Sequence, residues 1–137
     1  MKVLVVEDSN LLRQRLINLL REIAGLEVVG EGQDSQGSLS TLHESKPQVV
    51  LIDIHLSKGS GVALIKRIKL EHEALTIIAL SDEPSAIYQK RCTAAGADFF
   101  LDKTTGLVGI KKIMVSLMKE FETSGYKSDK TLTLDTA

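Results

Sequence analysis

The chain has 137 residues, of which 43% are hydrophobic and 26% charged, and its formal net charge is -1. This length suits one domain with a single core, and the near-neutral charge excludes a whole-molecule attraction to nucleic acid or anionic lipid. The first residues lead directly into a strand-like run without a signal-peptide or membrane-spanning pattern, so we expect a cytoplasmic protein. The single cysteine, Cys92, is predicted to be a buried structural residue.

Five short apolar runs alternate with amphipathic stretches along the chain. The runs cover residues 3–6, 28–29, 49–52, 77–80 and 99–101. Three of them consist almost entirely of Val, Ile and Leu, which is typical of parallel strands covered on both faces. Helical spacing predicts helices over residues 11–23, 39–42, 62–69, from Pro84 toward Cys92, and over 107–121. This alternation predicts an α/β fold with an open, doubly wound parallel sheet.

The apolar pattern stops near residue 122, and Thr, Ser, Lys and Asp dominate beyond it. We therefore predict a folded domain over residues 1–121 and a poorly ordered tail or linker stub over residues 122–137.

Polar residues follow four of the predicted strands, at the edge where doubly wound sheets bind ligands. Glu7 and Asp8 follow the first strand, Asp53 the third, Ser81 the fourth, and Lys103 comes after the fifth. Crowded carboxylates disfavour each other's ionised forms, and a bound cation relieves that cost. A ligand set of oxygens without a Cys and His cluster suits Mg2+.

Asp53 directly follows the most apolar strand, which would hold its carboxylate rigidly. A carboxylate placed in this way beside Mg2+ can attack phosphorus and form an aspartyl phosphate. Lys103 would supply a positive charge to the phosphate, and the Ser81 hydroxyl would donate a hydrogen bond to it. The sequence thus indicates a phosphoryl-accepting site.

Four separated segments carry a resemblance to a known family, in the right order. They are Val3-Leu-Val-Val-Glu-Asp8, Val49-Val-Leu-Ile-Asp53, Leu80-Ser81 and Gly96-Ala-Asp-Phe-Phe-Leu-Asp-Lys103. With these segments the chain resembles a bacterial response-regulator receiver domain over roughly residues 2–121. The resemblance implies a flavodoxin-like fold of five βα units with strand order 2-1-3-4-5.

The resemblance also implies a role for each matching residue. Asp53 would be the phospho-acceptor, Glu7 and Asp8 the acidic pair that binds Mg2+, and Lys103 the phosphate-binding lysine. His55 would give its backbone carbonyl to the metal, while Ser81 and Phe100 would form the conformational switch. Such a protein is not a separate enzyme, because it catalyses only its own phosphorylation and dephosphorylation.

The expected partners are a sensor histidine kinase or phosphotransfer protein and an unknown downstream protein, with no direct contact to nucleic acid or membrane. The signal would leave through the face made by the fourth helix, the fifth strand and the fifth helix. The same face is a candidate homodimer surface.

Several positions depart from the family pattern or lie outside it. Ser57 and Thr104 stand where the family often has proline, and the lysine-proline bond is typically cis in the family. The His55 side chain would be either a solvated loop group or a modulator of dephosphorylation. His43 and His72 lie among charged residues on helix-like stretches and are predicted to be surface groups.

Three other functions compete with this interpretation. A phosphatase with an aspartate nucleophile usually has a second acid two residues later, where this chain has His55. A flavin or nucleotide binder needs a phosphate-binding loop rich in Gly, Ser and Thr after the first strand. This chain has Glu7 and Asp8 there, and their negative charges would repel the phosphate. A receiver-like interaction module that works without phosphorylation is the third, and Mg2+ titration would distinguish it.

Overall fold

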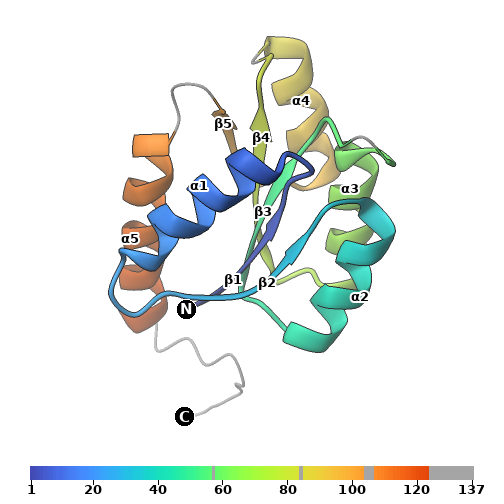
Figure 1. Ribbon diagram of the computed structural model, residues 1–137. Coiled ribbons are helices and arrows are strands. Elements are labelled where there is room, and N and C mark those ends of the chain that lie inside the picture. The colour runs from blue at the N-terminus through green and yellow to red at the C-terminus, as the bar shows by residue number, and fades with distance from the viewer. Residues whose placement is uncertain (57, 84, 104–106, 124–137) are drawn as a thin grey trace.

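The computed structural model describes residues 1–56, 58–83, 85–103 and 107–123. Five strands form one parallel sheet in the order β2-β1-β3-β4-β5 (Figure 1). The fold class and the strand order implied by the resemblance are both confirmed. The strands are β1 (Lys2–Val6), β2 (Glu27–Gly32), β3 (Val49–Asp53), β4 (Thr76–Ser81) and β5 (Phe99–Asp102).

Five helices alternate with the strands and cover both faces of the sheet. They are α1 (Asn10–Arg21), α2 (Ser35–Ser45), α3 (Gly61–Glu71), α4 (Ala86–Ala95) and α5 (Leu107–Thr123). The helices α1 and α5 pack on one face, and α2, α3 and α4 pack on the other (Figure 1). This arrangement buries the sheet between two helical layers.

The alternation of side chains along each strand divides the core into two halves. Leu4 and Val6 of β1 pack toward α2 and α3, whereas Val3 and Val5 pack toward α1 and α5. All four side chains are fully buried, because a central parallel strand is covered on both faces. Cys92 on α4 is also buried, as predicted, and burial raises the pKa of its thiol.

The helix boundaries differ from the predicted ones in detail. The first helix ends at Arg21, and a turn through Gly25, with φ of 85°, leads to β2. Leu11 begins the helix predicted over residues 11–23, and in the structure it lies in the first turn of α1 with 65% of its surface exposed. The fourth helix begins only at Ala86, where Ser85 is its N-cap.

Some predictions fall on positions outside the described residues. They concern Ser57, Pro84, Thr104 and residues 124–137 of the predicted tail. The last helix ends at Thr123, two residues beyond the predicted domain boundary.

The turn between β3 and α3 brings two backbone segments unusually close. A Cβ atom on Gly61 would lie 2.4 Å from the carbonyl oxygen of Asp53 and 2.4 Å from the Cα of Ile54. Only glycine permits this approach without displacing the chain. The first turn of α3 therefore packs directly against the carboxyl end of β3, which holds Asp53 in place.

Across the described residues, none of the helices has the length and apolar character needed to cross a membrane.

Candidate functional site

Three charged side chains meet at the carboxyl edge of the sheet. Glu7 follows β1, Asp53 ends β3, and Lys103 follows β5. Glu7 is 0% exposed and Asp53 is 1% exposed. The Nζ atom of Lys103 lies 3.1 Å from Glu7 Oε1 and 3.1 Å from Asp53 Oδ2. One ammonium group therefore faces two buried carboxylates.

Backbone N–H groups orient these carboxylates. The N–H of His55 donates to Asp53 Oδ1 at 2.9 Å, and the N–H of Ser9 donates to Glu7 Oε2 at 3.1 Å. Lys103 donates a hydrogen bond to Asp53 Oδ2, whereas its contact with Glu7 Oε1 is an ion pair without hydrogen-bond geometry. Glu7 Oε1 is consequently a buried oxygen that pairs with Lys103 but accepts no hydrogen bond among the described residues.

Burial and neighbouring charges shift the pKa values of two groups in the site. The pKa of Glu7 is raised from 4.5 to about 7, chiefly by burial and also by the nearby charge of Asp53, while the Ser9 N–H and Lys103 partly oppose the rise. Burial alone would lower the pKa of Lys103, but its contacts with Asp53 and then Glu7 outweigh that effect and raise it. Glu7 and Asp53 therefore share the Lys103 ammonium.

The residues fit a hard divalent cation. Glu7, Asp8 and Asp53 each offer a carboxylate oxygen, and these three oxygens lie within 4.8 Å of one another. Mg2+ prefers carboxylate oxygens and retains several waters. The buried Glu7 Oε1 makes an ion pair with Lys103 but no hydrogen bond among the described residues, so it is an oxygen that such an ion would satisfy. The three acids selected in the sequence are thus brought together.

The remaining predicted residues surround this group. Ser81 at the end of β4 is fully buried, and its Oγ accepts from the N–H of Glu83 at 3.0 Å. The carbonyl oxygen of Ser81 accepts from the N–H of Lys103 at 2.9 Å, which ties β4 to the lysine. Phe100 is half-buried and packs against the core beneath α4.

The His55 ring has a neighbour that the sequence did not suggest. The side chain is exposed, and its ring meets the ring of Tyr88 on α4 edge-on, with centroids 5.0 Å apart and planes at 89°. Edge-to-face geometry is a favourable arrangement for aromatic rings. The loop that donates to Asp53 is thus in direct contact with α4.

Arg13 on α1 is a second residue that the sequence interpretation missed. It is 4% exposed, and its Nη1 donates to the carbonyl oxygen of Glu7 at 2.7 Å. Its other contacts are an ion pair from Nε to Glu31 at 2.9 Å and a short hydrogen bond to Asn10. The sequence did offer a signal: Arg13 lies three positions before Leu16, so the two residues share the buried face of the helix.

We expect Arg13→Met to lower the free energy of unfolding by about 1 to 3 kcal/mol, because the substitution leaves the buried carbonyl of Glu7 without its charged donor. Urea unfolding would measure this change. Arg15→Met on the exposed side of α1 is the matched control and should have little effect. Equal stability of the two variants would show that the buried contact contributes nothing.

Comparison with known proteins places this geometry in a family. Residues 3–115 match the family model of the response regulator receiver domain. The chain belongs to this family. Receiver domains generally are not classical enzymes, and they typically bind Mg2+ through acidic residues. Response regulators interact with histidine kinases and with downstream targets.

The relatives of this receiver domain are longer proteins. The chain is 32% identical over 106 residues to the response regulator GacA of Pseudomonas syringae, covering 77% of this chain and 50% of the relative. It is 31% identical, with the same coverage, to the virulence factors putative positive transcription regulator BvgA of Bordetella pertussis. The chain thus spans about half the length of these relatives.

Solved structures agree in fold. A LuxR-family response regulator from Aurantimonas superimposes with a TM-score of 0.81 at 18% identity, over 87% of this chain and 85% of that one. The isolated receiver domain of RcsB from Salmonella enterica gives a TM-score of 0.80 at 24% identity, over 87% and 88% of the two chains. At these identities the likeness establishes the fold alone.

Proposed function

We propose that this receiver domain accepts a phosphoryl group on Asp53 in a Mg2+-dependent reaction. The observation that carries the proposal is the buried Asp53 carboxylate, fixed by the His55 N–H and by Lys103, next to the other acids of the site. The donor would be a sensor histidine kinase or a phosphotransfer protein. Glu7, Asp8, Asp53 and the backbone carbonyl of His55 would hold the metal ion.

The chain's own groups suit each part of this reaction. A carboxylate oxygen of Asp53 forms the new bond to phosphorus, while the bond from phosphorus to the donor nitrogen breaks and its electron pair stays with that nitrogen. Lys103 stays near the phosphoryl oxygens and offsets their negative charge. A bound Mg2+ would neutralise charge on the same oxygens. Hydrolysis then needs only a water in line with the phosphorus.

Mass spectrometry tests the proposal directly. Incubation of the full chain with a small phosphodonor and Mg2+ should add one phosphoryl group that is labile in base. Omission of Mg2+ should abolish the addition. A chain that stays unmodified with Mg2+ and donor present would instead support the competing function, a receiver-like interaction module that works without phosphorylation.

Asp8→Asn is expected to weaken Mg2+ binding by about tenfold or more, since the ion depends on few protein ligands. Isothermal titration of Mg2+ into the unphosphorylated protein measures the affinity. Asp82→Asn, at an exposed acid beyond β4, is the control and should bind Mg2+ like the wild type. The metal assignment is wrong if the two variants bind equally well.

The signal would leave through the surface formed by α4, β5 and α5. Large hydrophobic side chains that remain exposed on these elements are Ile87, Phe99, Val108 and Val115. Phosphorylation adds roughly 1.5 to 2 negative charges and would draw the Ser81 hydroxyl away from the Glu83 N–H. Phe100 could then move further inward and reshape this surface. A downstream protein, or a second copy of the chain, would bind there.

The remaining sequence predictions are consistent with this function. They are a cytoplasmic location, a receiver over residues 1–121 followed by a tail, and no direct contact with nucleic acid or membrane. The His55 imidazole would modulate hydrolysis of the phosphoryl group. Its contact with Tyr88 gives it a defined place beside α4.

A further inference from the structure

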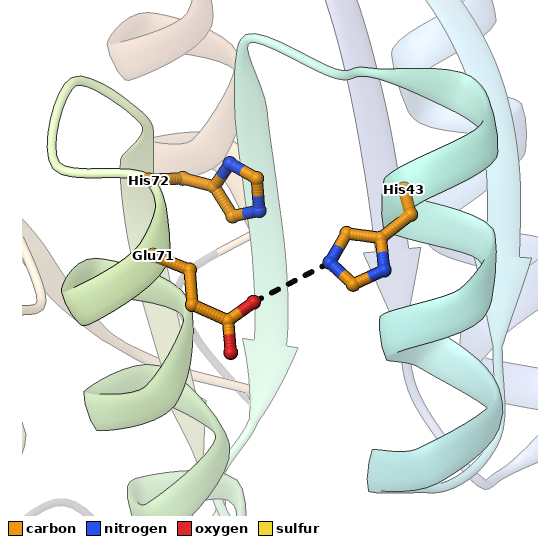
Figure 2. Close-up of side chains that lie close together, drawn as sticks. All are labelled: His43, Glu71 and His72. Carbon is orange, nitrogen blue, oxygen red and sulfur yellow. Dashed lines mark hydrogen bonds and ion pairs between the residues drawn. The ribbon is translucent and has the colours of Figure 1, made fainter.

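A second group of metal-binding side chains lies between the ends of α2 and α3. His43 projects from the last turns of α2, Glu71 is the last residue of α3, and His72 is the C-cap of that helix (Figure 2). One ligand atom from each of these residues lies within 4.8 Å of the other two. Figure 2 shows the two rings and the carboxylate directed into the same space between the helices.

The spacing of these side chains is close to that of a tetrahedral metal site. His43 Nε2 lies 3.4 Å from Glu71 Oε1. In a tetrahedral zinc site the bond lengths place two such ligand atoms about 3.3 to 3.6 Å apart. The two imidazole rings have centroids 5.6 Å apart and planes at 53°, so they are not stacked on each other.

His72 presents a ring nitrogen that the protein does not use. Its Nε2 is buried and lacks a hydrogen-bond partner among the described residues. The backbone of His72 is fixed on both sides, because its N–H donates to Ile68 at 2.7 Å and its carbonyl accepts from Leu75 at 3.1 Å. A buried nitrogen without a partner is costly. A metal ion would satisfy this nitrogen without moving the backbone.

The surroundings of Glu71 also suit a metal ligand. The Nε of Arg67 donates to Glu71 Oε2 at 3.1 Å, which orients the carboxylate and leaves Oε1 directed at His43. Metal-binding carboxylates are commonly held by such an outer hydrogen bond. The side chains of His43 and Glu71 are 52% and 39% exposed, so an ion can enter from solvent.

Charge and ligand type limit which metal fits. Arg67 contacts Glu71, and Lys46 lines the same cavity as His43 and His72. These two positive side chains would repel a cation that the site attracted by negative charge alone. Imidazole nitrogens bind Zn2+, Cu2+ and Ni2+ well, whereas Mg2+ and Ca2+ prefer oxygen ligands. The two imidazole ligands therefore favour a transition metal over Mg2+.

We propose that His43, Glu71 and His72 form a binding site for a transition-metal ion of the Zn2+ class, with the fourth coordination position open to water. The site is separate from the acidic group of Glu7, Asp8 and Asp53, because α2 and α3 end at the amino edge of the sheet, opposite the carboxyl edge that holds Asp53. A bound ion would fasten the end of α2 to the end of α3. The plain alternative is an exposed His43–Glu71 ion pair with no metal function.

Calorimetric titration of Zn2+ into the full chain, with excess Mg2+ present to occupy the acidic group, tests this site. The wild type should bind one Zn2+. His43→Gln and His72→Gln should each weaken binding by about tenfold or more. His55→Gln removes the only histidine outside the group, and Asp8→Asn disables the acidic site, so both should leave Zn2+ affinity unchanged.

Two further measurements separate lost ligands from lost structure. Zn2+ should raise the thermal unfolding midpoint of the wild type but not that of His43→Gln, whose exposed position makes a folding defect unexpected. Zn2+ should also shift the ring signals of His43 and His72, but not those of His55, in NMR spectra. The proposal is overturned if the wild type binds no Zn2+ or if His43→Gln binds it as tightly. It is also overturned if Asp8→Asn or His55→Gln removes the binding.

Discussion

Asp53→Asn is expected to abolish the phosphoryl adduct, because an amide oxygen is too weak a nucleophile to replace the carboxylate. Mass spectrometry after incubation with a phosphodonor and Mg2+ would show the unmodified mass. Asp82→Asn, an exposed acid at the same edge of the sheet, should accept one phosphoryl group as the wild type does. An adduct that persisted on the Asp53→Asn protein would place the acceptor elsewhere.

The same variant should remain folded and should be at least as stable as the wild type above pH 7. Lys103 faces both Asp53 and Glu7, so removal of the Asp53 charge leaves one cation with one carboxylate. The pKa of Glu7 is raised from 4.5 to about 7, so repulsion between the acids is present above that pH and disappears as Glu7 is protonated. Any gain in unfolding free energy should thus be seen at about pH 8 and fade toward pH 5.

Lys103→Ala should have the opposite effect on stability. The Lys103 side chain is only 12% exposed, and its loss leaves two buried carboxylates without their shared cation. Breaking a buried ion pair in this way costs about 3 kcal/mol. Urea unfolding without metal should show the loss at about pH 8 and a smaller one near pH 5, where Glu7 is protonated. Lys111→Ala on the exposed side of α5 is the matched control.

Lys103→Ala should also uncouple phosphorylation from the change in shape. The ammonium of Lys103 contacts the acceptor Asp53, and the backbone N–H of Lys103 donates to the Ser81 carbonyl at the end of β4. The ammonium would move with the charge of the phosphoryl group and so link the acceptor to β4. Amide chemical shifts of α4 and α5 should therefore change on phosphorylation in the wild type and much less in this variant. Wild-type shifts in the phosphorylated variant would rule out this coupling role.

The sequence alone determined the fold class and the composition of the candidate site. Apolar runs of two to four residues that alternate with helical spacing permit few arrangements, and strands joined by helical crossovers typically lie parallel in one sheet. The carboxyl ends of parallel strands meet at one edge, so Glu7, Asp53 and Lys103 were grouped correctly although 96 positions separate the first from the last. To predict this grouping it is enough to know where each strand ends, and local sequence patterns reveal those ends.

Only the tertiary structure decided which side chains share partners. The spacing along the chain does not reveal that one Lys103 ammonium lies 3.1 Å from two carboxylates, or that Arg13 turns back onto the Glu7 carbonyl. His72 was predicted to be a surface group, yet its Nε2 is buried, and its ring lies 5.6 Å from the ring of His43 on α2. Such contacts depend on how the helices pack on the sheet. The distances between packed elements are set by all the side chains between them, and no local sequence pattern reveals them.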